Sequence, residues 1–472
     1  LSAIGAFTLY DVSTGNNTLI YNSTHAEISW TLSNLTTATD LEINSLVFLE
    51  YNLAGLVTST NNLELNNTAT ITLKSVSGLT SPTVQRNGQD CGGVCSAVVD
   101  LGSNNYQFNV SQFSNYSLAS EENDLFIFQI NTTASPQNFS FQVDDANLTV
   151  NWGDGNTTNY NGTVLLNHTF ATAGIYNISV NGTASRIAFS KYYDIYSQEA
   201  TPELLKDILT PVSDGVTGIT SASEMFAFTN ITNFTATDFF DITSQNVTDM
   251  RYMFYTSQFN QNISDWDVSN VTDTSIMFAY TPFNQSLNGW DVSNVTTMLY
   301  MFRDAVDFNQ DLSGWDVSRV ITMSNMFRNA DSFNENISTW NVSNVTDMRF
   351  MFFSADSFNQ SIGNWDVSNV TQMDGMFSYA ISFNQDLDSW DVSSVVDMQQ
   401  MFKDADAFNN NISTWNVSSV TDMSNMLWGT EFNQSINNWD VSNVTDMSSM
   451  FSYSNFNQNI SSWNVSSVTD MS

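Results

Sequence analysis

The second half of the chain repeats one pattern of hydrophobic and polar positions. Each copy reads W-D/N-V-S-x-V-T-D-M-x-x-M-F-x-x-A-x-x-F-N-Q-x-I/L, and its Trp recurs every 24 or 25 residues from Trp266 to Trp463. One copy cannot bury its apolar side chains alone, so neighbouring copies have to stack and share a core. Residues 216–472 are therefore predicted to form a leucine-rich-repeat-like solenoid.

A comparison of the copies separates inward from outward positions. The Trp, two Val, two Phe and one Ile or Leu stay apolar in every copy, which predicts a core. A stripe of Trp can also stack on sugar rings, but its invariance next to fixed Val favours the core. The tryptophans assigned to this core include Trp290, Trp315, Trp340 and Trp365.

The Asn that follows the second Phe is also the same in every copy. A buried polar side chain has to be hydrogen-bonded, so this position predicts an asparagine ladder from coil to coil. Its members include Asn284, Asn309, Asn334, Asn359 and Asn384. We therefore expect the glycosylation sequons that begin at Asn284, Asn359 and Asn433 to carry no glycan.

The fifth position of the motif WDVSNVTDM varies, and one copy places Arg319 there. A position that accepts Arg faces solvent, so the Asn residues found there are predicted glycan carriers. They are Asn270, Asn294, Asn344, Asn369 and Asn443.

Acidic residues also recur at fixed places, as in Asp267, Asp291 and Asp316. Stacked coils lie about 4.8 Å apart, so identical charges in a column repel each other. One hypothesis is that such runs bind Ca²⁺. The simpler interpretation is relief by the Asn residues that interrupt the column, together with screening by salt.

The first half of the chain predicts two Ig-like β-sandwich modules, over residues 1–120 and 121–185. Short apolar or alternating segments such as FTLYDV, AEISWTL and ATITLKSV lie between Asn, Gly, Ser and Thr in the first module, and FIFQI, FSFQV and IYNISV in the second. In the second module we expect a turn at Asp154-Gly155, core positions at Trp152 and Phe170, and a structural role for His168.

Residues 186–215 are predicted to connect the modules to the solenoid and to cap it. The segment TPELLKDIL places Thr201 as an N-cap and Pro202 at the first helical position, which predicts a short helix. Such a cap would cover the unpaired edge of the first coil.

Composition narrows the function classes. The 472 residues include 48 acidic and 11 basic side chains, a net charge of −37. This charge repels phosphate backbones and anionic membranes, which argues against nucleic-acid binding. We found no stretch of the ~18 apolar residues that a membrane helix needs. Because the chain starts at Leu1 and stops within a repeat, we expect a mature chain or a fragment, with further coils following.

Cysteine and sequon use point to export. Cys91 and Cys95 are close enough for a small disulfide loop; a zinc site would need two further ligands, and free thiols are the third interpretation. The chain contains 32 Asn-x-Ser/Thr sequons, 14 of them within residues 1–200. N-linked glycosylation of a secreted protein explains this excess, although a merely Asn- and Thr-rich β protein is the alternative. The candidates before the repeat are Asn16, Asn22, Asn34, Asn66, Asn109, Asn115, Asn131, Asn147, Asn156, Asn161 and Asn177.

Three segments resemble known families. The copies FNQSLNGWDVSNVTTMLYMF and FNQSIGNWDVSNVTQMDGMF closely resemble the BspA-like leucine-rich-repeat surface proteins. The combination of WGDG, HTF and AGIY resembles a PKD domain, and the segment around the two Cys resembles β-sandwich modules of archaeal cell-surface proteins. The resemblance to the BspA-like proteins implies secretion, display on the cell surface and adhesion. The chain departs from that family in its sequon density and in lacking the Cys that some copies carry.

The sequence therefore favours a non-enzymatic, glycosylated, extracellular structural or adhesive protein of the cell surface, such as a subunit of a filament or surface layer. The alternative is a monomeric adhesin or a carbohydrate-binding or glycan-directed protein. No G-x-S-x-G, H-E-x-x-H or P-loop motif is present. We expect no cofactor, and as partner either further copies of the chain or a ligand on a cell surface.

Overall fold

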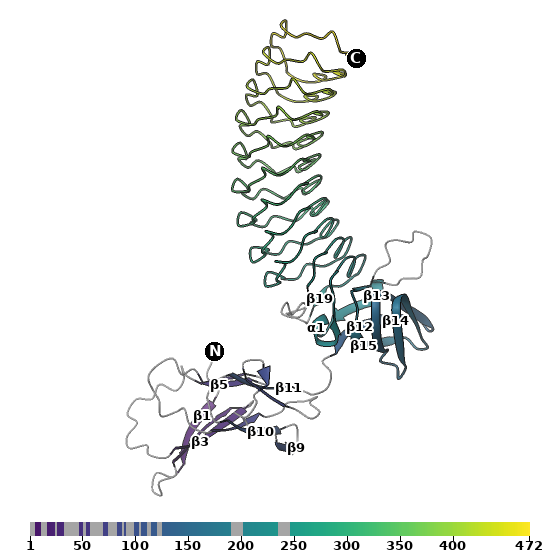
Figure 1. Cartoon of the computed structure of the whole chain (residues 1–472), viewed down its shortest axis with the longest axis vertical. Helices are drawn as coiled ribbons and strands as arrows, with labels where there is room; N and C mark the ends of the chain where they lie inside the picture. Colours follow the sequence, from purple (N-terminus) through teal and green to yellow (C-terminus); the bar gives the residue numbers. More distant parts are fainter. Residues whose placement is uncertain are drawn as a thin grey trace. The chain divides into compact units, whose positions relative to one another are not determined.

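The computed structural model describes residues 125–189, 202–234 and 246–472 and, in the first 124 residues, the backbone of eleven strands. The chain forms two compact units, Leu1–Asp124 and Leu125–Ser472. The fold is mainly β, and helix is confined in the described residues to single turns (Figure 1). Cys91 and Cys95 lie outside the described residues.

The first unit contains two antiparallel sheets. The six-stranded sheet has the order β1 (Gly5–Tyr10), β2 (Asn17–Ser23), β3 (Ala26–Leu32), β6 (Ala69–Leu73), β10 (Asn105–Val110), β9 (Val99–Gly102). The five-stranded sheet has the order β4 (Val47–Glu50), β5 (Leu53–Leu56), β11 (Asn115–Ala119), β7 (Thr83–Arg86), β8 (Gln89–Asp90).

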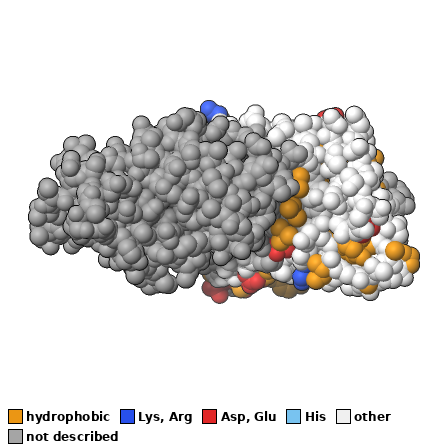
Figure 2. Space-filling view, turned by 90° about the horizontal axis from the view of Figure 1, so that it is seen from below, with side chains coloured by type: hydrophobic (Ala, Val, Ile, Leu, Met, Phe, Trp, Pro, Cys, Tyr) orange, Lys and Arg blue, Asp and Glu red, His pale blue; other side chains and the backbone are white. Residues whose placement is uncertain are grey.

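The second unit opens with a further sheet, in which β14 (Thr157–Phe170), β13 (Gln137–Asn151), β15 (Gly174–Thr183) and β12 (Phe126–Thr132) are neighbours in that order. Burial alternates along β12, as expected for a strand with one face on the core. Trp152 and Phe170 are fully buried, and Gly153 and Gly155 have φ of 76° and 95° in the turn between β13 and β14. Hydrophobic side chains form only small patches on the described surface seen in Figure 2.

The helix predicted from Thr201 and Pro202 is wrong beyond its first turn. Pro202–Leu204 forms a single 3₁₀ turn, and the chain continues as β17 (Leu205–Ile208). As a strand, Leu205 and Ile208 both become buried and pair with Ile130 and Phe128 of β12. Tertiary pairing with an open sheet edge therefore outweighs the local helix signal. The only α-helical turn in the described chain is α1 (Val212–Gly215).

The repeats continue directly from this sheet. The short strands β18 (Val216–Thr217) and β19 (Asn233–Phe234) pair in parallel with β15 and β17, and β16 (Arg186–Ala188) pairs with β13. A parallel bridge then joins Arg186 to Ser221, and one further bridge per coil runs to Asp470. The coils lie on one another like rungs (Figure 1). We call residues 219–472, as far as they are described, the repeat stack.

Backbone hydrogen bonds explain how one coil holds the next. In the segment from Met348 to Ala355, the N–H groups of Met348, Phe350, Phe352 and Ser354 donate to carbonyls of the following coil. The N–H groups of Met351, Phe353 and Ala355 donate to the carbonyl three residues earlier, and that of Arg349 donates to Asp347 Oδ1. Nearly every amide of the segment is therefore used, half of them between coils.

Rings stacked from coil to coil fill the core. Phe327 and Phe352 stack with centroids 5.7 Å apart, and Trp340 and Trp365 with centroids 6.3 Å apart. Phe189, just after β16, stacks on Phe226 and so begins the ladder inside the sheet. The Trp side chains are 3–4 % exposed from Trp266 to Trp439, and each indole from Trp290 onward donates to a carbonyl of the preceding coil.

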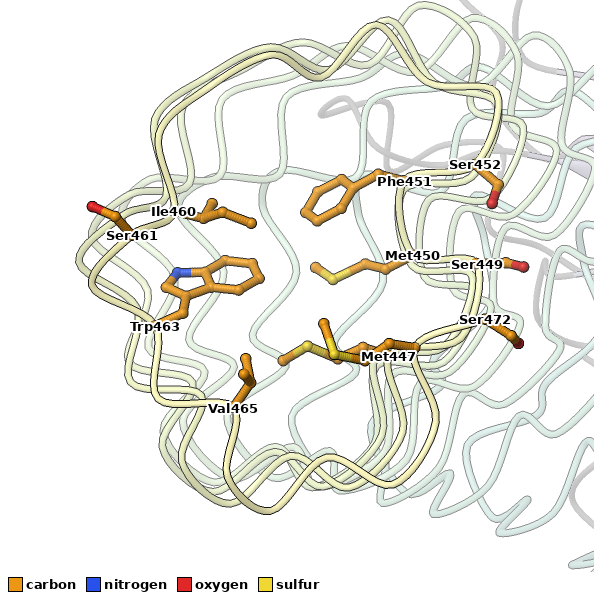
Figure 3. A pocket seen from close by; sticks show the side chains of 11 residues that line it. Met447, Ser449, Met450, Phe451, Ser452, Ile460, Ser461, Trp463, Val465 and Ser472 are labelled. Atoms are coloured by element: carbon orange, nitrogen blue, oxygen red, sulfur yellow. The ribbon is translucent and has the colours of Figure 1, made fainter.

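The last coil shows this core in cross-section (Figure 3). Met447, Met450 and Phe451 point inward from one side, and Ile460, Trp463 and Val465 point inward from the other. Ser449, Ser452 and Ser461 point away from the core. In each earlier coil, the following coil covers the equivalent side chains.

We predict that the ring ladder dominates stability. Replacing Phe352 with Ala should lower the free energy of unfolding by about 3–5 kcal/mol, because the residue is fully buried. Phe352→Leu should cost much less, since Leu427 occupies the same position in another coil. Urea unfolding of both variants checks this; equal losses would contradict the ladder as the source of stability.

Candidate functional site

One side of the repeat stack carries the side chains that vary most between copies. They are the two residues between the paired Met and the two residues after the first Phe of each copy, which lie outside the core. We call these positions, from Arg251 to Tyr453, the aromatic face. Every aromatic residue of 246–472 that is not in the ring ladder lies there: Tyr252, Tyr255, Tyr280, Tyr300, Phe350, Phe353, Tyr379, Trp428 and Tyr453.

Basic residues gather on the same face. Residues 246–472 contain six Arg or Lys, and five of them occupy the aromatic face: Arg251, Arg303, Arg328, Arg349 and Lys403. The sixth is Arg319 in the WDVS segment. A chain with only 11 basic residues in total thus concentrates almost half of them on one strip.

Several of the aromatic residues adopt an unfavourable backbone conformation. Tyr300, Phe350 and Tyr379 have φ of 57°, 53° and 61°, in the left-handed region. For a bulky residue this region costs roughly 1–2 kcal/mol, whereas Gly avoids the cost. Gly375 and Gly429 occupy the equivalent positions in other coils. The aromatic side chains are therefore present despite the backbone, which is a recurring feature of functional sites.

Three cations each lie over two rings of the face. Arg303 lies 5.4 and 5.2 Å from the ring centres of Tyr280 and Tyr300, Arg328 lies 5.5 and 4.4 Å from Phe350 and Phe353, and Lys403 lies 5.6 and 5.1 Å from Tyr379 and Trp428. Except for Arg303 and Tyr300, which belong to one coil, each cation and its ring come from adjacent coils. Each exposed contact contributes about 0.5–1 kcal/mol and orients both partners.

Other cations are neutralised locally. Arg251 pairs with Asp249 at 2.9 Å and approaches Asp273 at 3.5 Å, while Arg349 pairs with Asp347 at 2.8 Å. The face is therefore amphoteric rather than a strong positive patch. Aromatic contact and hydrogen bonding, more than net charge, decide what it can bind.

Polar atoms without hydrogen-bond partners cluster at its centre. Four buried side-chain polar atoms lack a partner in the described part of the chain, and three of them lie here: Arg328 Nε, Asp374 Oδ1 and Ser378 Oγ. The ring of Phe350 lies over Gly375, where a Cβ would come within 2.2 Å of a ring carbon. These atoms are buried beneath the rings, so each one costs the fold energy rather than offering a free contact to a ligand.

Among the acidic residues of the face, Asp374 has the pKa that is shifted most from its usual value. Burial and, next, the nearby Asp397 carboxylate raise its pKa to about 6, while Arg349 acts in the opposite direction. Burial also raises the pKa of Asp397. Lowering the pH from 7 to 5 therefore changes Asp374 from an acceptor into a group that can also donate.

The predicted glycan carriers lie at various depths. Asn147, Asn156, Asn161 and Asn177 are exposed on the sheet that precedes the stack, and Asn131 is half-buried. In the stack Asn270, Asn344, Asn369 and Asn443 are exposed and Asn294 is half-buried. The side chains of Asn16, Asn22, Asn34, Asn66, Asn109 and Asn115 lie outside the described residues.

The asparagine after the second Phe links coils through its side-chain oxygen. Asn334 Oδ1 accepts the backbone N–H of Asn359 at 2.9 Å, and Asn359 Oδ1 accepts that of Asn384 at 3.0 Å. The same bond joins each member of the column to the next from Asn260 to Asn457. The ladder members are half-buried up to Asn334 and exposed from Asn359 onward.

The remaining candidates have local roles. His168 stacks on Trp152 at 4.7 Å and contacts Asp154 at 2.8 Å, in the turn between β13 and β14. Asp267 and Asp316 each accept the N–H of the Ser two residues later. No group of three or more His, Cys, Asp or Glu placed to hold a metal ion occurs in the described ranges.

Sequence comparison places the chain among repeat proteins. The chain belongs to the family described as Mycoplasma protein of unknown function, DUF285, whose model matches residues 220–340, 321–431 and 409–472. These matches run along the repeat stack. No curated protein and no solved structure matches the chain. Within the described part of the chain, no helix has the length and hydrophobicity to cross a membrane.

We predict that Asp374 makes stability depend on pH. Its folded pKa lies above its unfolded value, so the buried carboxylate destabilises the fold above pH 6, and protonation relieves this as the pH falls towards 4. Asp374→Asn should therefore raise stability at pH 7 by on the order of 1 kcal/mol, and the gain should vanish near pH 4.

Thermal unfolding of wild type and variant across this pH range measures the effect. Asp316→Asn is the control and should lower stability at pH 7, because hydrogen bonds from Ser318 lower the pKa of Asp316 and its charged form stabilises the fold. A gain for Asp374→Asn that is the same at pH 4 and pH 7 would contradict the role of the buried charge.

Proposed function

We propose that this chain is a non-enzymatic, glycosylated structural and adhesive protein of the cell surface, with the aromatic face as its binding surface. One observation carries the proposal: aromatic side chains recur at two left-handed backbone positions of the coil, where the Gly, Asn or Asp found in other coils costs less backbone energy. A residue that costs backbone energy and contributes no core packing is best explained by a contact with a partner.

The composition of the face supports this role. Tyr, Trp and Arg are the residues most enriched where binding energy concentrates in interfaces. Tyr280 and Tyr379 are 41 % and 37 % exposed, and Val306 and Ile381 lie exposed two positions beyond the face. The cation–π contacts hold the rings in place, which reduces the entropy lost on binding.

The proposal includes a finer architecture. The modules over residues 1–120 and 121–185 would be Ig-like sandwiches, the second PKD-like, and residues 186–215 would connect them to a BspA-like leucine-rich-repeat solenoid over 216–472. The buried Trp152 and the glycine turn after it support the PKD-like assignment. The bridges repeated once per coil support the solenoid. A disulfide between Cys91 and Cys95 would suit an exported chain.

The partner we favour is a second copy of the chain, and the alternative is a ligand on another cell surface. A contact between two different surfaces of neighbouring copies would propagate into a filament or layer. A sugar chain is the other candidate ligand, since the same rings provide stacking platforms.

We predict that the face can lose its aromatic residues without losing the fold. Tyr379→Gly combined with Tyr280→Gly should change the unfolding free energy by only about 1 kcal/mol, because relief of left-handed strain offsets lost cation–π contacts. Self-association in sedimentation velocity, or adhesion of the labelled protein to cells, should fall at least about tenfold.

Ile321→Thr is the matched control, because Ile321 is 53 % exposed outside the face and other copies have Thr there. It should leave binding unchanged. If the double variant still associates and adheres like wild type, the proposed binding role is wrong. Negative-stain images of native material separate the two partners: regular fibres support assembly, and isolated rods support the adhesin.

A further inference from the structure

Two turns of the coil are built on the same side-chain contact. One begins directly after the Trp in every coil, and the other begins four residues before the Trp in the coils that have Asn or Asp there. In the coil of Trp340, Asn336 Oδ1 accepts the N–H of Ser338 at 3.0 Å, and Asn341 Oδ1 accepts the N–H of Ser343 at 3.2 Å. Other coils make the same turns with Asp, as between Asp311 and Ser313 or Asp316 and Ser318. The turn therefore needs only the side-chain oxygen.

Wherever Asn makes one of these turns, the sequence is also a sequon. The middle residue is the Ile or Val of the core, buried in every coil but the last, and the Ser that donates to the turn is the third sequon position. Seven residues share this arrangement, and all are exposed: Asn262, Asn336, Asn341, Asn411, Asn416, Asn459 and Asn464. We call them the turn asparagines.

The asparagines of the motif VSNVT are engaged differently. The amide Nδ2 of Asn369 donates to the carbonyl of Ser343 in the preceding coil at 2.7 Å, and Asn344 Nδ2 does the same to Ser318. Where this position is Ser419, its hydroxyl donates to the carbonyl of Ser393 at 2.7 Å. This position therefore supplies a donor that ties neighbouring coils together.

From this contrast we infer that the turn asparagines, rather than the VSNVT asparagines, carry the N-linked glycans of the repeat stack. The inference rests on the proposed function, because it requires an exported, glycosylated chain. Asp replaces the turn Asn in other coils without loss of the turn, so the fold does not need the Nδ2 atom that a glycan would occupy. In the turn asparagines, an Nδ2 contact is present only from Asn411 to Asp388 within the described stack.

The chemical step uses that nitrogen. A glycosyltransferase would join Nδ2 to the anomeric carbon of a phosphate-activated glycan. The bond from that carbon to the phosphate oxygen breaks, the phosphate leaves with the bonding electrons, and one Nδ2 proton is lost. The glycosylated amide keeps its Oδ1, so the turn hydrogen bond survives.

Placement along the stack also favours these sites. The two turn sites of one coil lie on either side of its Trp, five residues apart, as Asn336 and Asn341 do, and the next such pair, Asn411 and Asn416, lies three coils further on. By contrast, Asn344 and Asn369 lie in adjacent coils, whose stacked rings are only 5.7 Å apart. Two glycans there would compete for the same space.

The turn sites also leave the proposed binding surface open. In Figure 3, Ser461, two residues after Asn459, points outward on the side of the coil opposite Ser449 and Ser452, which belong to the aromatic face. We call the side of the stack that carries the Trp residues the Trp side, and the side that carries the paired Met and the first Phe the Met–Phe side. Glycans at the turns would cover the Trp side and leave the Met–Phe side, with its aromatic face, free.

Glycopeptide mass spectrometry of the full chain, secreted from a host with N-glycosylation, tests the inference. We expect glycan at Asn341, Asn416 and the other turn asparagines, with Asn344 and Asn369 bare. Asn341→Asp, which copies Asp366, should remove one glycan and leave the unfolding temperature of the deglycosylated chain unchanged. Asn369→Ser, which copies Ser394, should leave the glycan pattern unchanged.

The outcomes separate this inference from the proposed function. Glycan on Asn344 or Asn369 with bare turn asparagines overturns the inference. Glycan confined to sequons before residue 190 also overturns it, but leaves the chain a glycoprotein. A chain without any glycan overturns both the inference and the glycoprotein part of the proposed function.

Discussion

The repeat stack depends on hydrogen bonds between the backbones of successive coils. In the Met–Phe segment, alternate N–H groups donate to the next coil, and those between them close tight turns within their own coil. This arrangement requires left-handed residues at fixed places, such as Phe350 and Ser354 in one coil. It also fixes the spacing at which Phe352 stacks on Phe327 and Phe377. The nearly constant core of the copies follows, because each coil must fit a similar neighbour on both sides.

Side-chain hydrogen bonds close the rest of each coil, and they explain the composition. Asp or Asn at the turns accepts an N–H two residues on, and the asparagine ladder accepts one from the next coil. Such turns favour Asp and Asn because their short side chains can reach the backbone. Many of the 48 acidic residues therefore serve local structure, and the net charge of −37 is in part a consequence of turn chemistry. At Asp374 the carboxylate is buried, which raises its pKa to about 6 and makes its charged form destabilise the fold.

The Trp side and the Met–Phe side of the stack use their polar side chains differently. The Trp side uses its polar residues for turns and for bonds between coils, and its exposed amide nitrogens are the places where modification costs the fold least. On the Met–Phe side the backbone makes most of the turns, and the Asp before the first Met accepts one further N–H, as Asp347 does from Arg349. Most outward side chains here are therefore not needed for the turns. Aromatic and basic residues fill these positions in an order that differs from coil to coil. A surface with a constant frame and variable side chains is typical of repeat proteins that bind partners.

The sequence by itself determined the period and the apolar core positions, because a stack of similar coils shows inward positions as invariant ones. It also singled out the asparagine column, but that invariance reflects the bond to the next coil and not burial, since the members are exposed from Asn359 onward. It also indicated the turn after Trp152, since Gly permits the required φ. It did not determine the strand β17, where the open edge of a sheet outweighed the helix signal of Thr201 and Pro202. Nor did it reveal the aromatic face or the engagement of Asn369 Nδ2, because both depend on which atoms of adjacent coils meet. Only the tertiary structure, in which residues 25 positions apart become neighbours, decided those contacts.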